Sequence, residues 1–274
     1  MSRAAPHGVT PLGPNRRSGG PLRIGVLVSA TGANLNTLLG MQKRQPDAFQ
    51  VCLVASHGST AKALDVARDA GVETWTGDFD AYCGLASKAV GDEGRLRYRR
   101  RAREWHDTLD ARIADWEARH GALDLVVLAY HRWIEGSLLT RFEGRMINQH
   151  PGDLSVLDAS NRRLLVGNDP VRLAMTAGHT TTRTSCFLVD ARHDGGAVLC
   201  MGPPVPVEGR RATPEDAWEQ ELRQKDLSDR PCLEWTVRAF AAGRLALGEG
   251  THADGSRGVL VDGRPTELGG RRLA

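Results

Sequence analysis

Three largely apolar runs constrain the fold of this chain more than any other feature of its sequence. They cover residues 23–29, 51–55 and 123–129, and the first is bounded by residues typical of turns. A largely apolar run of this length suits a strand that is buried on both faces. A weaker run at residues 145–148 ends in polar residues. The sequence therefore predicts a sheet that is covered on both sides.

Helix-like segments separate these runs, at residues 34–41, 60–70 and 94–120, and a further short strand is predicted over residues 72–75. This alternation predicts an α/β fold of Rossmann-like type, with a mostly parallel sheet and helices on both faces. Ligands of such sheets bind beyond the carboxyl ends of the strands. The chain places unusual polar residues at three of those ends, in residues 29–34, 130–133 and 148–150.

The segment at residues 94–120 is long and highly charged. Its apolar residues recur every three or four positions, as on one face of a helix, at Trp105, Leu109, Ile113 and Trp116. The arginine-rich residues 95–103 begin this helix. A solvated helix face is the favoured interpretation. The alternative is a phosphate or nucleic-acid patch, but the aromatic partners that such patches use are missing.

The second half of the chain changes character. It contains a predicted short helix, two strands and an apolar stretch, over residues 169–178, 183–190, 197–201 and 235–242. Thr213, which is followed by proline and two acidic residues, predicts the start of another helix. Residues 259–264 contain an Asp-Gly pair and predict a C-terminal β-hairpin.

We expect one domain after a leader. Residues 1–21 are rich in Gly, Pro, Ser and Arg and are predicted to be a flexible leader that does not pack. Residues 22–274 form the predicted domain. Its Rossmann-like half covers residues 22–150, and its second half covers residues 151–274.

Charge and composition argue against several classes of protein. Lys and Arg number 36 against 33 Asp and Glu, and a net charge of +3 does not suggest binding to nucleic acid or a membrane. No apolar run approaches the roughly 18 residues of a membrane helix. The five cysteines form no CxxC pair, which argues against a disulfide framework or a cysteine zinc site. We expect a cytoplasmic protein without a bound metal.

Residues 29–35 join the first strand to the first helix. Free backbone N–H groups at the start of that helix could bind a phosphate or carboxylate. Gly32 would let the chain pass close to such a ligand. The alternative is an ordinary tight turn in which Asn34 caps the helix. The full Gly-x-Gly-x-x-Gly and P-loop patterns are missing, so this segment alone is a weak signal.

An Asn-x-His-Pro group ends the fourth strand. Alternation along an extended strand points Asn148 and His150 the same way. An amide and an imidazole side by side can bind a carbonyl oxygen and manage a proton. A lone histidine more often packs and hydrogen-bonds locally, but this grouping at the ligand-binding edge favours a function.

The Asp-Gly-Gly segment at Asp194 has the composition of a turn. It has a catalytic role only if the Asp194 carboxylate lies near His150. There it would orient the imidazole or raise its pKa, and it could relay protons through water. The sequence alone does not place these two side chains together.

Together these segments resemble the folate-dependent formyltransferases of the glycinamide ribonucleotide formyltransferase type. Residues 23–39 (RIGVLVSATGANLNTLL) are similar to the family's opening strand and phosphate loop, and residues 124–134 (DLVVLAYHRWI) to its Asp-Leu-Val-Val-Leu-Ala strand. Residues 144–151 (GRMINQHP) match its Gly-Arg-x-x-Asn-x-His-Pro motif, and residues 186–207 resemble the stretch with Asp-x-Gly and Val-Pro-Val. The resemblance extends over residues 23–270.

The resemblance implies a formyltransferase fold with a C-terminal β-hairpin extension, and a one-carbon transferase that uses 10-formyltetrahydrofolate as its formyl donor. It implies three catalytic residues, of which the first two donate to an oxyanion and the third supports a charged imidazole: Asn148, His150 and Asp194. The folate-binding residues that it implies are Arg132, Trp133, Ile134, Asp190 and His193. The predicted substrate-binding residues are Thr31, Gly32, Ala33, Asn34 and Asp226.

Several positions depart from the family pattern. Ala33 replaces a hydroxyl residue of the phosphate loop, and Tyr130-His131 replaces a Gly-Phe pair. Gly152 begins the stretch where the family commonly has Ser-Leu-Leu-Pro, and residues 78–103 are longer than the family needs. These changes surround the expected amine substrate or the folate rim, which favours the same chemistry on a changed acceptor.

Three functions remain open. The favoured one is formyl transfer to an amine or hydroxylamine of a specialised metabolite, such as an N-hydroxyornithine-type siderophore precursor. The second is formylation of glycinamide ribonucleotide in purine synthesis. The third is a catalytically inactive module that binds folate or a nucleotide. The presence of Asn148, His150 and Asp194 argues against this third function. We expect a monomer or homodimer whose partner is a small-molecule amine.

Overall fold

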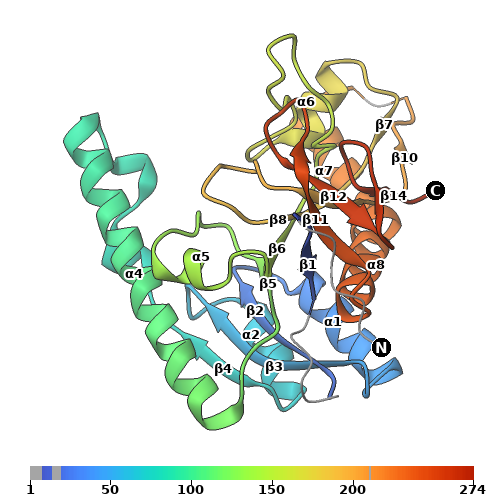
Figure 1. Ribbon diagram of the computed structural model, residues 1–274. Coiled ribbons are helices and arrows are strands. Elements are labelled where there is room, and N and C mark those ends of the chain that lie inside the picture. Colours follow the sequence, from blue (N-terminus) through green and yellow to red (C-terminus); the bar gives the residue numbers. More distant parts are fainter. Residues whose placement is uncertain (1–7, 14–19, 210) are drawn as a thin grey trace. The chain divides into compact units, whose positions relative to one another are not determined.

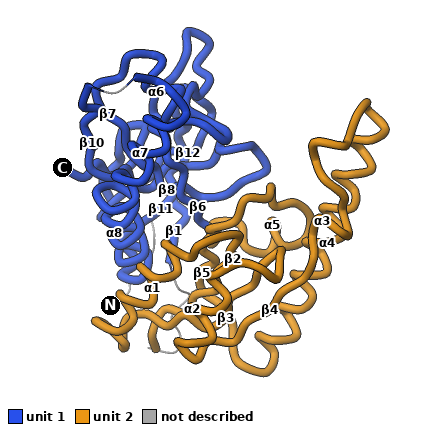
Figure 2. The backbone as a smooth tube through the Cα atoms, turned by 180° about the vertical axis from the view of Figure 1, so that it is seen from behind, with its two compact units in different colours: residues 1–15, 147–274 blue, residues 16–146 orange. Residues whose placement is uncertain are grey.

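The computed structural model describes residues 8–13, 20–209 and 211–274 of the chain. The chain divides into two compact parts, which Figure 2 shows in different colours. We call residues 16–146 the N-terminal part, and residues 1–15 with 147–274 the C-terminal part. The division follows Met146, inside strand β6, whereas the predicted halves divide after residue 150.

The N-terminal part contains parallel strands that are adjacent in the order β5-β2-β3-β4 (Figure 1). Its strands and main helices lie where the sequence predicts them. In chain order its elements are β2 (Leu22–Val28), α1 (Ala33–Arg44), β3 (Phe49–Ser56), α2 (Lys62–Asp69), β4 (Glu73–Thr76), α3 (Phe79–Cys83), η1 (Ala86–Lys88), α4 (Gly91–His120), β5 (Leu125–Ala129) and α5 (Ser137–Arg141).

The strand order changes direction at β2. Strands β2, β3 and β4 step one way, and β5 returns to the other side of β2. Right-handed crossovers therefore place α1 and α2 on one face of these strands and α4 on the opposite face. Val26 and Val127, in the two central strands, have no exposed surface, as expected of strands that are covered on both sides. The predicted Rossmann-like arrangement is confirmed.

Residues 78–103, which we expect to be longer than the family needs, contain α3, η1 and the first part of the long helix α4. The residues that α4 buries include Ala102, His106, Ile113 and Trp116. Trp105, which the sequence places on the buried face, is only half-buried, and His106 takes the fully buried position. Among the described residues, no helix combines the length and the apolar character needed to span a membrane.

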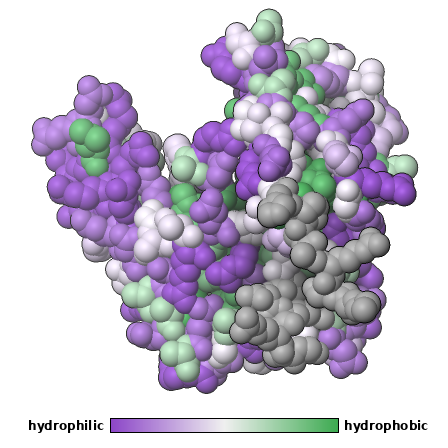
Figure 3. Space-filling view, in the orientation of Figure 1, coloured by the Kyte–Doolittle hydropathy of each residue, from purple (hydrophilic) through white to green (hydrophobic). Residues whose placement is uncertain are grey.

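The arginine-rich start of α4 behaves as a solvated helix face. Arg95 pairs with Asp92 at 2.7 Å and Arg97 with Glu93 at 3.7 Å, both within the helix. Figure 3 shows this end of α4 covered mainly by hydrophilic side chains. The favoured interpretation of this run therefore agrees with the structure.

In the C-terminal part, β14, β9, β8 and β6 are adjacent in that order, and β1, β11, β12 and β13 form a second set. β8 is antiparallel to both β6 and β9, whereas β14 is parallel to β9. The elements are β1 (Thr10–Leu12), β6 (Met146–His150), α6 (Pro170–Thr176), β7 (Thr181–Thr182), β8 (Ser185–Leu188), β9 (Val198–Met201), β10 (Val205–Pro206), α7 (Pro214–Gln224), η2 (Lys225–Asp229), α8 (Arg230–Ala241), β11 (Leu245–Thr251), β12 (Arg257–Val261), β13 (Arg264–Pro265) and β14 (Arg271–Arg272).

Two local predictions in this part are confirmed. The Thr213 hydroxyl accepts a hydrogen bond from the backbone N–H of Asp216 at 3.1 Å and caps α7. Asp262 and Gly263 have φ angles of 52° and 75° and connect β12 to β13. Two consecutive positive φ angles are what a type I′ hairpin turn requires, and the Asp-Gly pair supplies them.

The predicted leader is partly structured. Thr10–Leu12 form β1, which pairs antiparallel with β11, and the Leu12 side chain is 3% exposed. The prediction of a leader that does not pack is therefore wrong for these residues. A short edge strand needs only backbone hydrogen bonds and one buried side chain, which a Gly- and Pro-rich composition does not exclude. Residues 1–7 and 14–19 of the leader lie outside the described residues.

Candidate functional site

Strand β6 carries two of the three predicted catalytic residues. Its register with β8 pairs Asn148 with Phe187 and His150 with Ser185. Because Asn148 and His150 are two residues apart on one strand, their side chains leave the same face. His150 is 5% exposed. Asn148 is half-buried, and within the described part of the chain its side-chain amide has no hydrogen-bond partner, so it is available to a ligand.

Both ring nitrogens of His150 lie beside acceptor atoms. Nε2 is 2.7 Å from the carbonyl oxygen of Leu165, and Nδ1 is 3.7 Å from Oδ2 of Asp194. The hydrogen bond to the carbonyl requires a proton on Nε2. In the neutral ring, the Nδ1 lone pair then points at a carboxylate. Only the protonated imidazole can donate in both directions.

Burial and charge act in opposite directions on the pKa of His150. Burial lowers this pKa and is the larger effect, whereas the carboxylate of Asp194 raises it. The Asp194 carboxylate is the larger of the two influences that raise the pKa of His150, the other being the hydrogen bond to the Leu165 carbonyl, so removal of Asp194 would lower this pKa further.

Asp194 occupies the predicted turn in a left-handed backbone conformation, with φ 48°. Such a conformation is uncommon for a residue other than glycine. Its Oδ2 accepts a hydrogen bond from the backbone N–H of Gly167 at 3.1 Å and lies 3.3 Å from Nδ1 of His193. The 3.7 Å separation from His150 is too long for a direct hydrogen bond, but an oxygen atom of water or substrate could contact both groups.

Gly152 explains one departure from the family pattern. A Cβ atom at this position would lie 2.5 Å from the Leu165 carbonyl oxygen and 2.9 Å from Nε2 of His150. Any side chain would therefore disturb the hydrogen bond that fixes the imidazole ring. Glycine here is a condition for the observed orientation of His150.

The predicted phosphate loop lies in the N-terminal part and follows β2. Helix α1 begins at Ala33, and Gly32, with φ 87°, is its N-cap residue. The interpretation of Asn34 as the cap is therefore wrong, because Asn34 already lies inside the helix. A Cβ at Gly32 would lie 3.1 Å from Cα of Ala63, so glycine serves the turn and the approach to α2. Thr31 and Ala33 are exposed.

The loop after β5 lies beside the loop after β2. The backbone N–H of His131 donates to the Ser29 hydroxyl at 2.7 Å and joins the two strand ends. The Arg132 guanidinium binds both carboxylate oxygens of Asp80 in α3, at 2.9 and 2.8 Å. Ile134 is 2% exposed, whereas Trp133 is 45% exposed. Among the predicted folate contacts of this loop, Trp133 presents the largest accessible surface.

The remaining predicted ligand contacts lie in the C-terminal part. The Asp190 carboxylate is held by Arg192, whose Nη2 is 2.7 Å away. The side chains of His193 and Asp226 are 51% and 70% exposed, and Asp226 pairs with Arg230 at 2.6 Å in the π-helical segment η2. Among the described residues, no group of three or more His, Cys, Asp or Glu side chains is placed to hold a metal ion.

Sequence reasoning missed Arg163. This residue donates to the carbonyl oxygens of Asp194 and Gly196 and so contacts the turn that carries a predicted catalytic residue. No motif marks it, because it lies in an irregular segment beside a second arginine, and its partners lie far along the chain.

Comparison with known proteins gives one family and several relatives. The family model described as formyl transferase matches residues 22–208. The human trifunctional purine biosynthetic protein adenosine-3 is 23% identical over 228 residues, which is 83% of this chain but 19% of that protein. The chain therefore spans only a small fraction of the length of this relative.

Solved structures share the fold. Phosphoribosylglycinamide formyltransferase from Coxiella burnetii has a TM-score of 0.68 and 23% identity, covering 93% of this chain and all of that one. Glycinamide ribonucleotide transformylase 1 from Symbiobacterium toebii has a TM-score of 0.63 and 26% identity, covering 89% of this chain and 95% of that one. Formyltetrahydrofolate deformylase from Burkholderia mallei has a TM-score of 0.59 and 17% identity, covering 89% of this chain and 70% of that one.

The family model covers more than half of the chain. This match confirms the predicted family and enzyme class, a one-carbon transferase, and it agrees with 10-formyltetrahydrofolate as the formyl donor. The structural neighbours agree with the predicted fold. The chain belongs to the formyl transferase family.

Proposed function

We propose that this protein transfers a formyl group from 10-formyltetrahydrofolate to an amine or hydroxylamine nitrogen of a small specialised metabolite. The observation that carries the proposal is the buried His150–Asp194 pair, with the unpartnered amide of Asn148 on the same strand face as His150. These are the groups that acyl transfer to an amine requires.

Asn148 and His150 would stabilise the charge that develops on the formyl oxygen when the amine attacks the formyl carbon. The Asn148 side chain supplies an N–H donor. Because Nε2 of His150 is committed to Leu165, the imidazole would present a second donor, Nδ1–H, toward the space beside Asp194 in its protonated form. Donors fixed before the reaction lower its barrier, because they need no reorganisation when the charge appears.

Asp194 would accept the proton that the attacking amine loses and pass it through water to the folate nitrogen that leaves. The new bond joins the amine nitrogen to the formyl carbon, and the bond from that carbon to the folate nitrogen breaks. The amine is itself the nucleophile, so no protein side chain forms a covalent intermediate.

The predicted ligand-binding residues complete the proposal. Trp133, with its exposed indole, suits contact with a flat heteroaromatic ring. We assign the rest of the folate contacts to Arg132, Ile134, Asp190 and His193, and the acceptor contacts to Thr31, Gly32, Ala33, Asn34 and Asp226. Arg132 is held by Asp80 and Ile134 is buried, so these two contribute mainly through their backbone.

Glycinamide ribonucleotide is the second candidate acceptor. The observation that favours it is the start of α1, where Gly32 opens a 12-residue helix with no acidic residue in its first turn. Such a helix start binds phosphate through backbone N–H groups. Relatives that act on this ribonucleotide by name share the fold. The hydroxyl missing at Ala33 argues for a different acceptor.

A titration and an acceptor panel test the proposal. The purified chain is first titrated with a 10-formyl folate analogue. Formyl release is then followed with glycinamide ribonucleotide, with a panel of amines and hydroxylamines, and with no acceptor.

Each outcome decides between the functions. Turnover with a panel amine but not with the ribonucleotide supports the proposal, and turnover with the ribonucleotide makes the second candidate correct. Formate release without an acceptor would mean that water is the acceptor, as in a deformylase. Binding without any turnover would favour the inactive module, and absence of binding would refute a folate-dependent function.

A further inference from the structure

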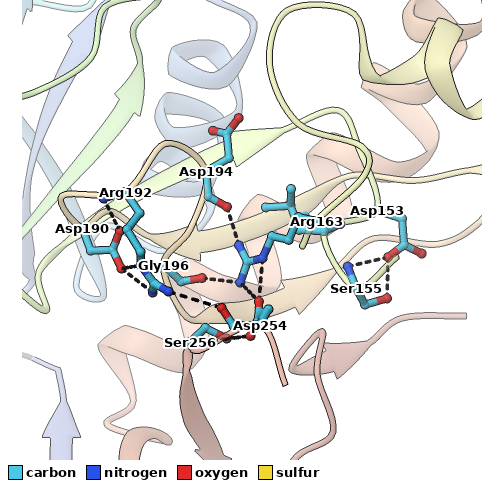
Figure 4. A network of polar contacts seen from close by, with 11 residues as sticks. Asp153, Ser155, Arg163, Asp190, Arg192, Asp194, Gly196, Asp254 and Ser256 are labelled. Carbon is cyan, nitrogen blue, oxygen red and sulfur yellow. Dashed lines mark hydrogen bonds and ion pairs between the residues drawn. The ribbon is translucent and has the colours of Figure 1, made fainter. Parts of the chain in front are cut away.

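A buried ion pair connects the C-terminal hairpin to the turn that carries Asp194. The side chains of Arg163 and Asp254 are 6% and 3% exposed, and Nη2 of Arg163 lies 2.6 Å from Oδ2 of Asp254. Nε of Arg163 donates to the same oxygen at 2.7 Å. Arg163 lies between β6 and α6, and Asp254 lies in the turn between β11 and β12. Figure 4 shows this pair at the centre of a polar network.

The rest of the Arg163 guanidinium holds the catalytic turn. Nη1 donates to the carbonyl oxygen of Asp194, and Nη2 donates to that of Gly196 at 2.8 Å. One side chain therefore fixes the backbone on both sides of Gly195. In Figure 4, the carbonyl of Asp194 faces Arg163 while its carboxylate points away from the network.

Asp254 is fixed in turn by its own hairpin. Its Oδ1 accepts hydrogen bonds from the backbone N–H and the hydroxyl of Ser256, at 3.0 and 2.7 Å. Its second oxygen is left for Arg163. A guanidinium stays charged and is costly to bury unless its donors are satisfied, so this arrangement is stable only as a complete set of contacts.

We propose that Arg163 and Asp254 are positioning residues that hold the Asp194 turn in its left-handed conformation and so direct the Asp194 carboxylate toward His150. This inference rests on the proposed function in that it takes Asp194 to be catalytic. It also gives a role to a region beyond the family match, which ends at residue 208. The C-terminal hairpin would then help to set the geometry of the site.

Three variants separate positioning from simple stabilisation. Arg163→Met leaves the buried Asp254 carboxylate without its cation, whereas the double variant Arg163→Met with Asp254→Asn removes both charges and keeps the Ser256 contacts. Removing both partners of a buried pair usually restores much of the stability that a single removal costs. Arg163→Lys keeps the charge but cannot span Asp254 and both carbonyl oxygens. The control is Arg162→Met, because the Arg162 side chain is 79% exposed and pairs with Asp158.

The first readout does not depend on activity. The Gly167 backbone N–H donates to Oδ2 of Asp194, so its hydrogen exchange reports where that carboxylate lies. We expect its exchange to accelerate about tenfold or more in Arg163→Met and in the double variant, but not in Arg162→Met. Unchanged exchange at Gly167 in the double variant would overturn the proposal.

The second readout is turnover with the acceptor that the panel identifies. We expect the double variant to melt near the wild-type temperature but to lose about tenfold to 100-fold in kcat, as for a small misplacement of a catalytic group, with partial rescue in Arg163→Lys. Full recovery of both melting temperature and kcat would show that the pair only stabilises the fold. If Asp194→Asn leaves kcat unchanged while Gly167 exchange still responds to Arg163→Met, the proposed role of Asp194 fails and the positioning contact stands.

Discussion

Two loops that carry predicted functional residues are both held by arginine ion pairs, but in different environments. The turn at residues 190–196 is held by Arg163 and Asp254, which are 6% and 3% exposed. The loop at residues 130–135 is held by Arg132 and Asp80, which are 25% and 40% exposed. Because water screens the second pair, it constrains its loop less tightly than the buried pair constrains the turn.

Helices α3 and α4 supply the contacts that support the loop at residues 130–135. Asp80 of α3 binds Arg132, Arg99 of α4 binds Glu135, and Asp107 of α4 accepts from the backbone N–H of Ser137 at 2.6 Å. The Arg99 guanidinium also lies over the Trp133 ring, 5.4 Å from its centroid. These two helices therefore support the loop that we assign to the folate. The comparison predicts that the turn at residues 190–196 is rigid and that the loop at residues 130–135 is more adjustable.

The largest expected effect is at the rigid turn. Asp194→Ala and His150→Ala should each lower kcat by at least ~100-fold, because each removes a group that stabilises charge or moves a proton in the reaction. Steady-state kinetics and thermal melting measure activity and folding separately. Near-normal kcat in either variant, with folding intact, would place the chemistry elsewhere.

Two buried carboxylates can be compared: Asp254, which pairs with Arg163, and Asp229, which accepts a hydrogen bond from Thr184. Burial alone raises the pKa of Asp254, but Ser256 and Arg163 bring it below its usual range. Asp229 accepts a hydrogen bond from the Thr184 hydroxyl, and burial raises its pKa to about 6 although Thr184 and Lys225 act to lower it. Folding therefore favours the protonated form, so Asp229 costs stability as the pH rises from its unfolded pKa toward about 6.

Asp229→Asn should accordingly stabilise the protein above pH 6, by about 1–2 kcal/mol, because it removes the buried charge and keeps an acceptor for Thr184. Chemical denaturation between pH 4 and pH 8 should show the advantage growing with pH between about 4 and 6 and then levelling off. A constant difference across this range would mean that Asp229 is not the group responsible.

At the adjustable loop, smaller effects are expected. Arg132→Met and Asp80→Asn should each raise KM for the 10-formyl folate analogue about threefold to tenfold and leave kcat nearly unchanged, because the loop loses one partly exposed support. Arg97→Met is the matched control, since its pair with Glu93 lies within α4 but does not touch the loop. A fall in kcat as large as that of Asp194→Ala would remove the distinction between the two regions.

The smallest effect concerns Arg99 and Glu135. Arg99 is 58% exposed, so Arg99→Met should destabilise the protein by less than about 1 kcal/mol, and added salt should reduce the difference. Urea denaturation at low and high salt measures both quantities. A difference that does not respond to salt would indicate that the stacking of Arg99 on Trp133, and not the ion pair, holds the loop.

Short-range patterns in the sequence were sufficient to predict much of the fold. The apolar runs predicted β2, β3 and β5, and single residues predicted the cap at Thr213 and the turn at Asp262. These features depend on neighbours within a few positions. The sequence did not predict that His106 lies on the buried face of α4. A buried helix face is identified from its apolar residues, and His106 is polar although it is fully buried.

The site depends on contacts between distant segments, which no local pattern contains. The sequence supplied Asn148 and His150 through their spacing, but it linked Asp194 to them only through the family resemblance. The contact of Arg163 with Asp254 joins residues that are 91 positions apart. Sequence reasoning could not find it, because an arginine and an aspartate are ordinary surface residues until the fold buries them.

The strand β1 has a consequence for the order in which the protein folds. During synthesis, all of residues 16–146 leave the ribosome before β11 exists, so they can pack while translation continues. Thr10–Leu12, although made first, can find their partner only after residues 245–247 have emerged. β1 is therefore among the last elements to reach its native place, although the residues between it and β11 can fold earlier.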